Sequence, residues 1–105
     1  MTATTATTTT KIVDLFAYCN NCMARQNENY QLHKKDYATR RAEDQKIKDE
    51  MKNDVAAYFG FADLSEAVKT KVFEKAWEEG HSGGYMDVAM AYEDLLELAD
   101  FIKKN

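Results

Sequence analysis

The feature that most constrains this chain is its lack of residues that interrupt a helix. The 105 residues contain no proline, and only one of the four glycines, Gly60, precedes residue 80. Strands joined by tight turns usually need both residue types at their corners. The chain is therefore expected to be all-α, and its length is that of one small domain.

A long N-terminal helix is predicted over residues 10–59, where nothing breaks a helix. One stripe of side chains there recurs at spacings of three and four, which is typical of a coiled-coil seam. Because polar residues occupy the middle of the stripe, a turn somewhere in residues 36–44 is the alternative. We favour one helix whose seam, within residues 12–58, contacts a second chain. The seam consists of Ile12, Phe16, Cys19, Met23, Gln26, Tyr30, His33, Tyr37, Arg40, Asp44, Ile47, Met51, Val55 and Tyr58.

The segments on either side of this helix are assigned from composition and capping signals. Residues 1–9 are Thr-rich and are expected to form a disordered lead-in, with Thr10 as the first helix cap. Residues 10–105 then form a single helical domain. Its C-terminal part, residues 63–104, is predicted to be an antiparallel helical hairpin.

Local signals mark the two helices of the hairpin. Asp63 and Glu66 have the spacing of a capping box, and Gly80 is a typical helix stop. The next helix is expected to start within residues 82–85. Each helix has an apolar face at helical spacing. These faces consist of Leu64, Val68, Val72, Phe73, Ala76 and Trp77, and of Val88, Ala89, Tyr92, Leu95, Leu96, Ala99 and Ile102.

Charge is distributed unevenly along the chain. The net charge is −4, which argues against bulk nucleic-acid binding. Residues 24–52 carry eight Lys or Arg against six Asp or Glu, whereas residues 53–105 carry five against eleven. The two regions are oppositely charged and can attract one another within or between chains.

The sequence predicts a cytoplasmic protein without a membrane partner, because it shows neither a secretory signal nor an apolar segment of membrane-spanning length. Cys19 and Cys22 are then expected to stay reduced. Zinc would need a second ligand pair, and adding His33 or His81 would still require a ligand from another subunit. We therefore expect no metal and no cofactor.

A basic and aromatic segment, KKDYATRR at residues 34–41, is the candidate interaction surface. A contact with nucleic acid is disfavoured by the acidic total, and the spacing of Asp36 and Arg40 is typical of an ordinary intrahelical ion pair. The simpler alternative to a partner surface is a solvated helix face. The residues assigned to the interaction surface are Tyr30, His33, Tyr37, Arg40 and Arg41.

The second candidate site is GHSGG at residues 80–84. Gly83 and Gly84 would leave backbone N–H groups uncovered at the positive end of the next helix, a seat for a carboxylate or phosphate beside His81 and Ser82. We favour a structural corner instead. In that interpretation Gly80 adopts a left-handed conformation, Ser82 caps the next helix, and the side chains at positions 77, 81 and 85 staple the end of the hairpin.

The stretch WEEGHSGGYMDV, followed by YEDLLEL, resembles a short C-terminal signature of small proteins from bacteriophages and large DNA viruses. The resemblance spans residues 76–98. It implies a viral source and synthesis inside a host cell, but it carries no catalytic role. Nothing else in the chain reaches a catalytic motif, and a nucleotide hydrolase's phosphate loop is absent, so no enzyme is expected.

The leading functional hypothesis is a viral-type accessory protein that acts as an oligomeric helical interaction module for a host or viral protein. The alternative is a binder of a small anionic ligand or nucleotide at GHSGG. Under that alternative the ligand-binding residues are His81, Ser82, Gly83 and Gly84.

Overall fold

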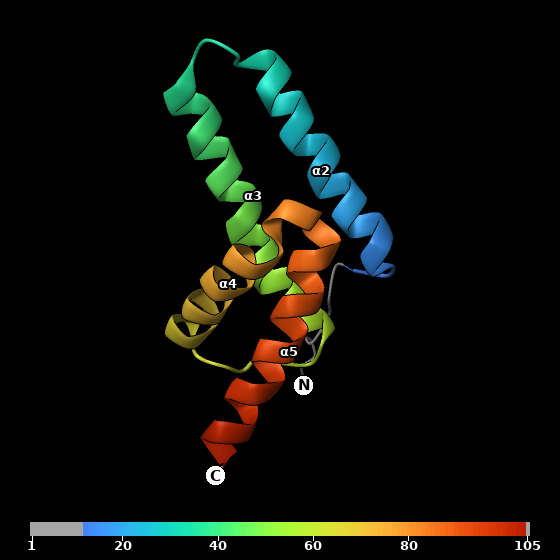
Figure 1. Ribbon diagram of the computed structural model, residues 1–105, viewed down its shortest axis with the longest axis vertical. Coiled ribbons are helices and arrows are strands. Elements are labelled where there is room, and N and C mark those ends of the chain that lie inside the picture. Colours follow the sequence, from blue (N-terminus) through green and yellow to red (C-terminus); the bar gives the residue numbers. More distant parts are fainter. Residues whose placement is uncertain (1–11, 105) are drawn as a thin grey trace, which may run out of the picture.

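The computed structural model describes residues 12–104, and these residues contain helices but no strand (Figure 1). The elements are α2 (Leu15–Leu32), α3 (Tyr37–Tyr58), α4 (Glu66–Gly80), a single 3₁₀ turn η1 (His81–Gly83) and α5 (Tyr85–Lys104). The all-α fold class is confirmed. The predicted lead-in at residues 1–9 and the predicted cap Thr10 lie outside the described residues.

The prediction of one helix over residues 10–59 is wrong. Helix α2 ends at Leu32, the chain turns at residues 33–36, and α3 runs back beside α2 (Figure 1). Asp36 caps α3, because its carboxylate accepts hydrogen bonds from the backbone N–H and the hydroxyl of Thr39 at 3.1 and 2.8 Å. The turn therefore starts at His33, before the range of 36–44 that the alternative considered.

This turn changes what the seam contacts. In α3 the predicted residues Ile47, Met51 and Val55 are buried. In α2 much of the predicted seam is displaced by one position: the buried residues are Leu15, Cys19, Cys22 and Asn29, whereas Phe16, Met23 and Tyr30 are exposed. Residues 12–58 therefore do not form one continuous seam, because α2 and α3 run side by side within one chain.

Helices α4 and α5 lie side by side and are joined through η1 (Figure 1). The N-cap of α4 is Ser65, whose hydroxyl accepts a hydrogen bond from the Val68 N–H at 3.2 Å. The prediction of a capping box that begins at Asp63 is therefore wrong. Most of the predicted inward face of α5 is correct: Val88, Ala89, Tyr92 and Leu96 are buried. Ile102, near the C-terminal end of α5, is 65% exposed.

The core lies where all four helices meet, and the tip of the α2–α3 hairpin projects away from it (Figure 1). Its largest fully buried side chains are Tyr92, Met51, Leu96, Val55, Val88 and Cys22. The molecule is elongated, with extents of 48 × 31 × 23 Å. No helix among residues 12–104 is long and apolar enough to cross a membrane.

Candidate functional site

The GHSGG corner is built around Trp77. The His81 ring stacks on the indole with centroids 5.7 Å apart and planes at 10°, and its Nδ1 lies 2.8 Å from the Trp77 carbonyl oxygen. The Tyr85 ring meets the indole edge-on at 5.8 Å. The predicted staple of these three side chains is confirmed: His81 joins η1 to the end of α4, and Tyr85 joins the start of α5 to it.

The glycines of the corner serve packing and backbone geometry. A Cβ at Gly80 would lie 2.8 Å from the Val88 nitrogen, so this glycine allows α4 and α5 to approach closely. Its φ is −116°, so the predicted left-handed conformation at Gly80 is wrong; Gly84, with φ 104°, adopts it instead. Because Gly84 directly precedes α5, Ser82 does not occupy the cap position predicted for it.

The surroundings of the corner bear on whether it can hold an anion. A hollow of about 440 Å³ is lined by Met23, Gln26, Trp77, His81, Ser82, Gly83, Gly84 and Tyr85. The carboxylate of Asp87, in the first turn of α5, lies directly against Gly83. The Gly84 N–H donates to the His81 carbonyl at 3.2 Å. A carboxylate already stands at the positive end of this helix and repels a second anion there.

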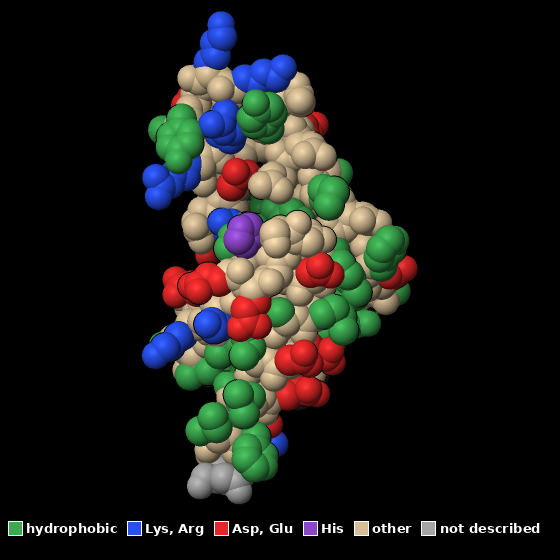
Figure 2. Space-filling view, viewed as in Figure 1, with side chains coloured by type: hydrophobic (Ala, Val, Ile, Leu, Met, Phe, Trp, Pro, Cys, Tyr) green, Lys and Arg blue, Asp and Glu red, His purple; other side chains and the backbone are tan. Residues whose placement is uncertain are grey.

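The predicted interaction surface lies at the tip of the α2–α3 hairpin. The Arg40 guanidinium lies over the rings of Tyr30 and Tyr37, 5.2 and 5.3 Å from their centroids. Its Nη1 donates to the Lys34 carbonyl at 3.0 Å, and Arg41 is exposed on the same helix. His33 is the C-cap of α2. The structure therefore brings all five predicted residues to one end of the molecule, where basic and hydrophobic side chains gather (Figure 2).

Polar contacts between α2 and α3 hold this tip in place. The Asn29 side-chain nitrogen donates to the Arg40 carbonyl and to the Asp44 carboxylate, both at 2.9 Å. Arg25 pairs with Glu50 at 2.8 Å. Asp36 faces Thr39, which lowers the pKa of its carboxyl group through hydrogen bonds, and does not form the predicted pair with Arg40. These polar contacts join α2 to α3 within one chain.

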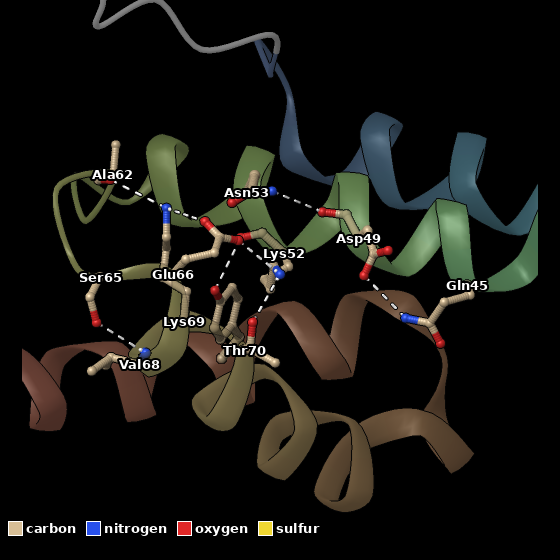
Figure 3. Close-up of polar contacts among 11 residues, drawn as sticks. Gln45, Asp49, Lys52, Asn53, Ala62, Ser65, Glu66, Val68, Lys69 and Thr70 are labelled. Carbon is tan, nitrogen blue, oxygen red and sulfur yellow. Dashed lines mark hydrogen bonds and ion pairs between the residues drawn. The ribbon is translucent and has the colours of Figure 1, made fainter.

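A lysine cluster that the sequence did not reveal joins α3, α4 and α5 (Figure 3). Lys52 Nζ lies 2.9 Å from the Glu66 carboxylate and donates to Thr70 at 3.0 Å. Lys69, only 8% exposed, reaches Glu66 at 3.5 Å and the Ala62 carbonyl at 3.3 Å. The Tyr92 hydroxyl donates to the Lys52 carbonyl at 3.0 Å. The polar groups of this cluster have their partners within the fold, which indicates a structural role for the cluster.

The comparison with known proteins gives one match. A family described as a family of unknown function, DUF8546, matches residues 7–100. This chain belongs to DUF8546. No curated protein and no solved structure matches. The DUF8546 match includes both the hairpin tip and the GHSGG corner, so the two candidate sites lie within the region that defines the family.

The two cysteines of this DUF8546 chain are both buried thiols. Burial, with a smaller contribution from Cys22, raises the pKa of Cys19 to about 11. Burial also raises the pKa of Cys22. Metals bind thiolates, which these environments disfavour. In the described part of the chain, no three His, Cys, Asp or Glu side chains are grouped in a way that could hold a metal ion.

Proposed function

We propose that this protein is an accessory interaction module that binds a partner protein through the hairpin tip, the surface made of Tyr30, His33, Tyr37, Arg40 and Arg41. The observation that carries the proposal is the placement of one arginine over two exposed tyrosine rings. Tyr30 and Tyr37 are 51% and 62% exposed. Tyrosine and arginine are the residue types that most often dominate binding energy at protein interfaces.

The tip is prepared for binding before a partner arrives. The Arg40 guanidinium lies over two tyrosine rings and donates a hydrogen bond to the Lys34 carbonyl. The Asn29 side chain of α2 donates to the Arg40 carbonyl and so fixes the backbone of α3 at this point. Side chains that are already ordered lose less conformational entropy when they are buried. Exposed aromatic rings at such a site offer a large contact area at a small entropic cost.

The charge of the tip indicates the chemistry of the partner. Lys34, Lys35 and Arg41 are exposed around the tyrosines, and the one acid of the turn, Asp36, is engaged by Thr39. A complementary partner presents acidic groups beside apolar ones. A protein partner is favoured over nucleic acid because the remainder of the chain is acidic. The viral resemblance suggests a host or viral protein in this role.

The test compares immobilised wild-type protein with Tyr30→Ser/Tyr37→Ser in binding experiments with host lysate, quantified by mass spectrometry. Lys71→Ala, an exposed change on α4, is the control. We expect one or more proteins to bind the wild type and the control but not the double variant. Equal recovery on all three would overturn the proposal, provided that circular dichroism shows the variants to be folded.

Binding of a small anion at the GHSGG corner is the second proposal, favoured by the 440 Å³ hollow beside His81. A ligand that binds only the folded state raises the melting temperature, by an amount set by its concentration relative to its Kd. Inorganic phosphate and nucleotides are the probes. A shift that disappears in His81→Ala would support the corner as a site; absence of any shift would leave the corner as a structural element only.

A further inference from the structure

The second half of α5 is an exposed surface that is both acidic and apolar. Leu98 and Ile102 are 54% and 65% exposed. Asp94 and Glu97 are exposed beside them, and Glu93 and Asp100 lie on the same half of the helix. Burial, and after it repulsion from Glu97 and Asp94, raises the pKa of Glu93. We refer to residues 93–102 as the α5 tail.

The α5 tail has the chemistry that the hairpin tip requires. The tip offers Lys34, Lys35 and Arg41 around two tyrosine rings. The tail offers the carboxylates of Asp94 and Glu97 beside aliphatic side chains, whereas Asp100 pairs with Lys104 at 2.9 Å. Opposite charges steer the two surfaces together, and the apolar side chains supply area to bury. Each surface is thus complementary to the other and repels a copy of itself.

The two surfaces cannot meet within one chain. They lie at opposite ends of a molecule that is 48 Å long, with the tip at the top of Figure 1 and the end of α5 at the bottom. Any contact between tip and tail is therefore a contact between two copies. The charge distribution along the sequence also allowed an attraction within one chain, but the tip and the tail are too far apart for it.

Both surfaces are visible on one face of the molecule. Figure 2 shows blue and green side chains at the tip, and red and green side chains along α5, from the same viewpoint. When two copies pack with these faces together and their long axes antiparallel, the tip of each copy meets the tail of the other. A two-fold axis makes both contacts identical, and the assembly closes at two chains.

We infer that the partner of the tip includes a second copy of this chain, and that the protein forms an antiparallel two-fold dimer in which each hairpin tip packs against the α5 tail of the other protomer. The inference rests on the proposed function, because it uses the tip as the docking surface. This dimer also differs from the predicted coiled-coil seam, whose residues Ile47, Met51 and Val55 are buried within one chain.

The experiment uses charge reversal at exposed positions. The tip variant is Lys34→Glu/Lys35→Glu and the tail variant is Asp94→Lys/Glu97→Lys. Lys46→Glu is the control, because it reverses an exposed charge but lies in neither surface. All proteins are checked by circular dichroism and then measured by light scattering at roughly 50 µM, where a dimer with a micromolar Kd is populated.

We expect wild type and control to have twice the mass of one chain, and each of the two surface variants to have the mass of one. Mixing the tip and tail variants in equal amounts should restore the dimer, because the mixed pair makes one native contact and one contact with both charges reversed. Raising the salt concentration should weaken the wild-type dimer, since salt screens exposed charges.

Three outcomes would overturn the inference. The first is a monomeric wild type, which leaves the proposed function intact if the lysate experiment still shows a partner at the tip. The second is a dimer that survives in either variant or is not restored by mixing, which indicates another interface. The third is a mass that keeps growing with concentration, which indicates an open chain of molecules instead of a closed pair.

Discussion

At the scale of single residues, the corner shows how one motif can combine several structural requirements. Gly80 lets two helices approach, Gly84 supplies a left-handed backbone, and His81 stacks on Trp77. Each of these roles excludes most other side chains for a different physical reason. Gly80, His81 and Gly84 therefore each have a structural role in the fold.

Gly80→Ala is expected to destabilise the protein by about 1–3 kcal/mol, because the new Cβ would lie 2.8 Å from the backbone of α5 and force the helices apart. Ser82→Ala is the comparison from the same corner. It is expected to cost less than about 0.5 kcal/mol, since Ser82 is exposed and does not cap α5. Denaturant unfolding measures both, and equal losses would contradict this account of the corner.

At the scale of elements, the fold depends on polar side chains that join one helix to the next. Asn29 connects α2 to α3, and Lys52 connects α3 to α4. Neither contact is local in sequence, and each holds a helix that has few buried apolar side chains of its own. The α2–α3 hairpin in particular keeps its shape near the tip through polar contacts.

Asn29→Ala is expected to destabilise the hairpin by about 1–3 kcal/mol, because the Arg40 carbonyl and the Asp44 carboxylate each lose a donor in a partly buried site. Asn27→Ala is the matched control, an asparagine on the exposed side of the same helix. Chemical denaturation compares the two variants. Similar losses for both would show that the bridge to α3 contributes little.

The contact between Lys52 and Glu66 predicts that the free energy of unfolding depends on pH in the acid range. The hydrogen bond from Lys52 lowers the pKa of Glu66 below its ordinary value of 4.5 in the folded protein. The resulting stabilisation is present above pH 4.5 and is lost as the pH falls through the folded-state pKa. Glu66→Gln should therefore melt lower than wild type at neutral pH, and the difference should shrink in acid. A difference that does not change with pH would refute this linkage.

At the scale of the whole molecule, the core contains ionisable groups that must stay neutral. Burial, and then a hydrogen bond to Asp54, raises the pKa of Tyr18. Burial raises the pKa of Tyr85 to about 12 and also raises that of Tyr92. Because these residues come from α2 and α5, their protonation state is coupled to the packing of the two hairpins.

Alkaline pH is expected to unfold the protein cooperatively. The folded-state pKa values of these tyrosines lie above the ordinary value of 10.0, so the stabilisation is complete below pH 10 and declines as the pH rises above it. The buried cysteines add to this effect from pH 9 upward. Tyrosinate absorbance and circular dichroism are followed together. Ionisation of all six tyrosines with no loss of helix would contradict the prediction.

Several features of the molecule followed from local patterns in the sequence. The lack of proline predicted the all-α class, and the spacing of apolar residues in α5 predicted most of its buried face. The contact of His81 with Trp77 was also predictable, because positions four apart lie on neighbouring turns of a helix. Tyr85 reaches the same indole because the chain turns back at the glycine corner. The five residues assigned to the interaction surface lie together at the hairpin tip, and their role in binding stays a prediction.

The path of the chain between Ile12 and Phe59 depended on tertiary structure. A spacing of three and four marks a helical face that needs a partner, but it does not say whether the partner is another molecule or the next segment of the same chain. No proline or glycine marks the turn at residues 33–36; only Asp36, as a cap, gave a local signal. The burial of Asn29 and Lys69 was equally hidden, because a polar side chain is buried only when it finds hydrogen-bonding partners in the folded structure.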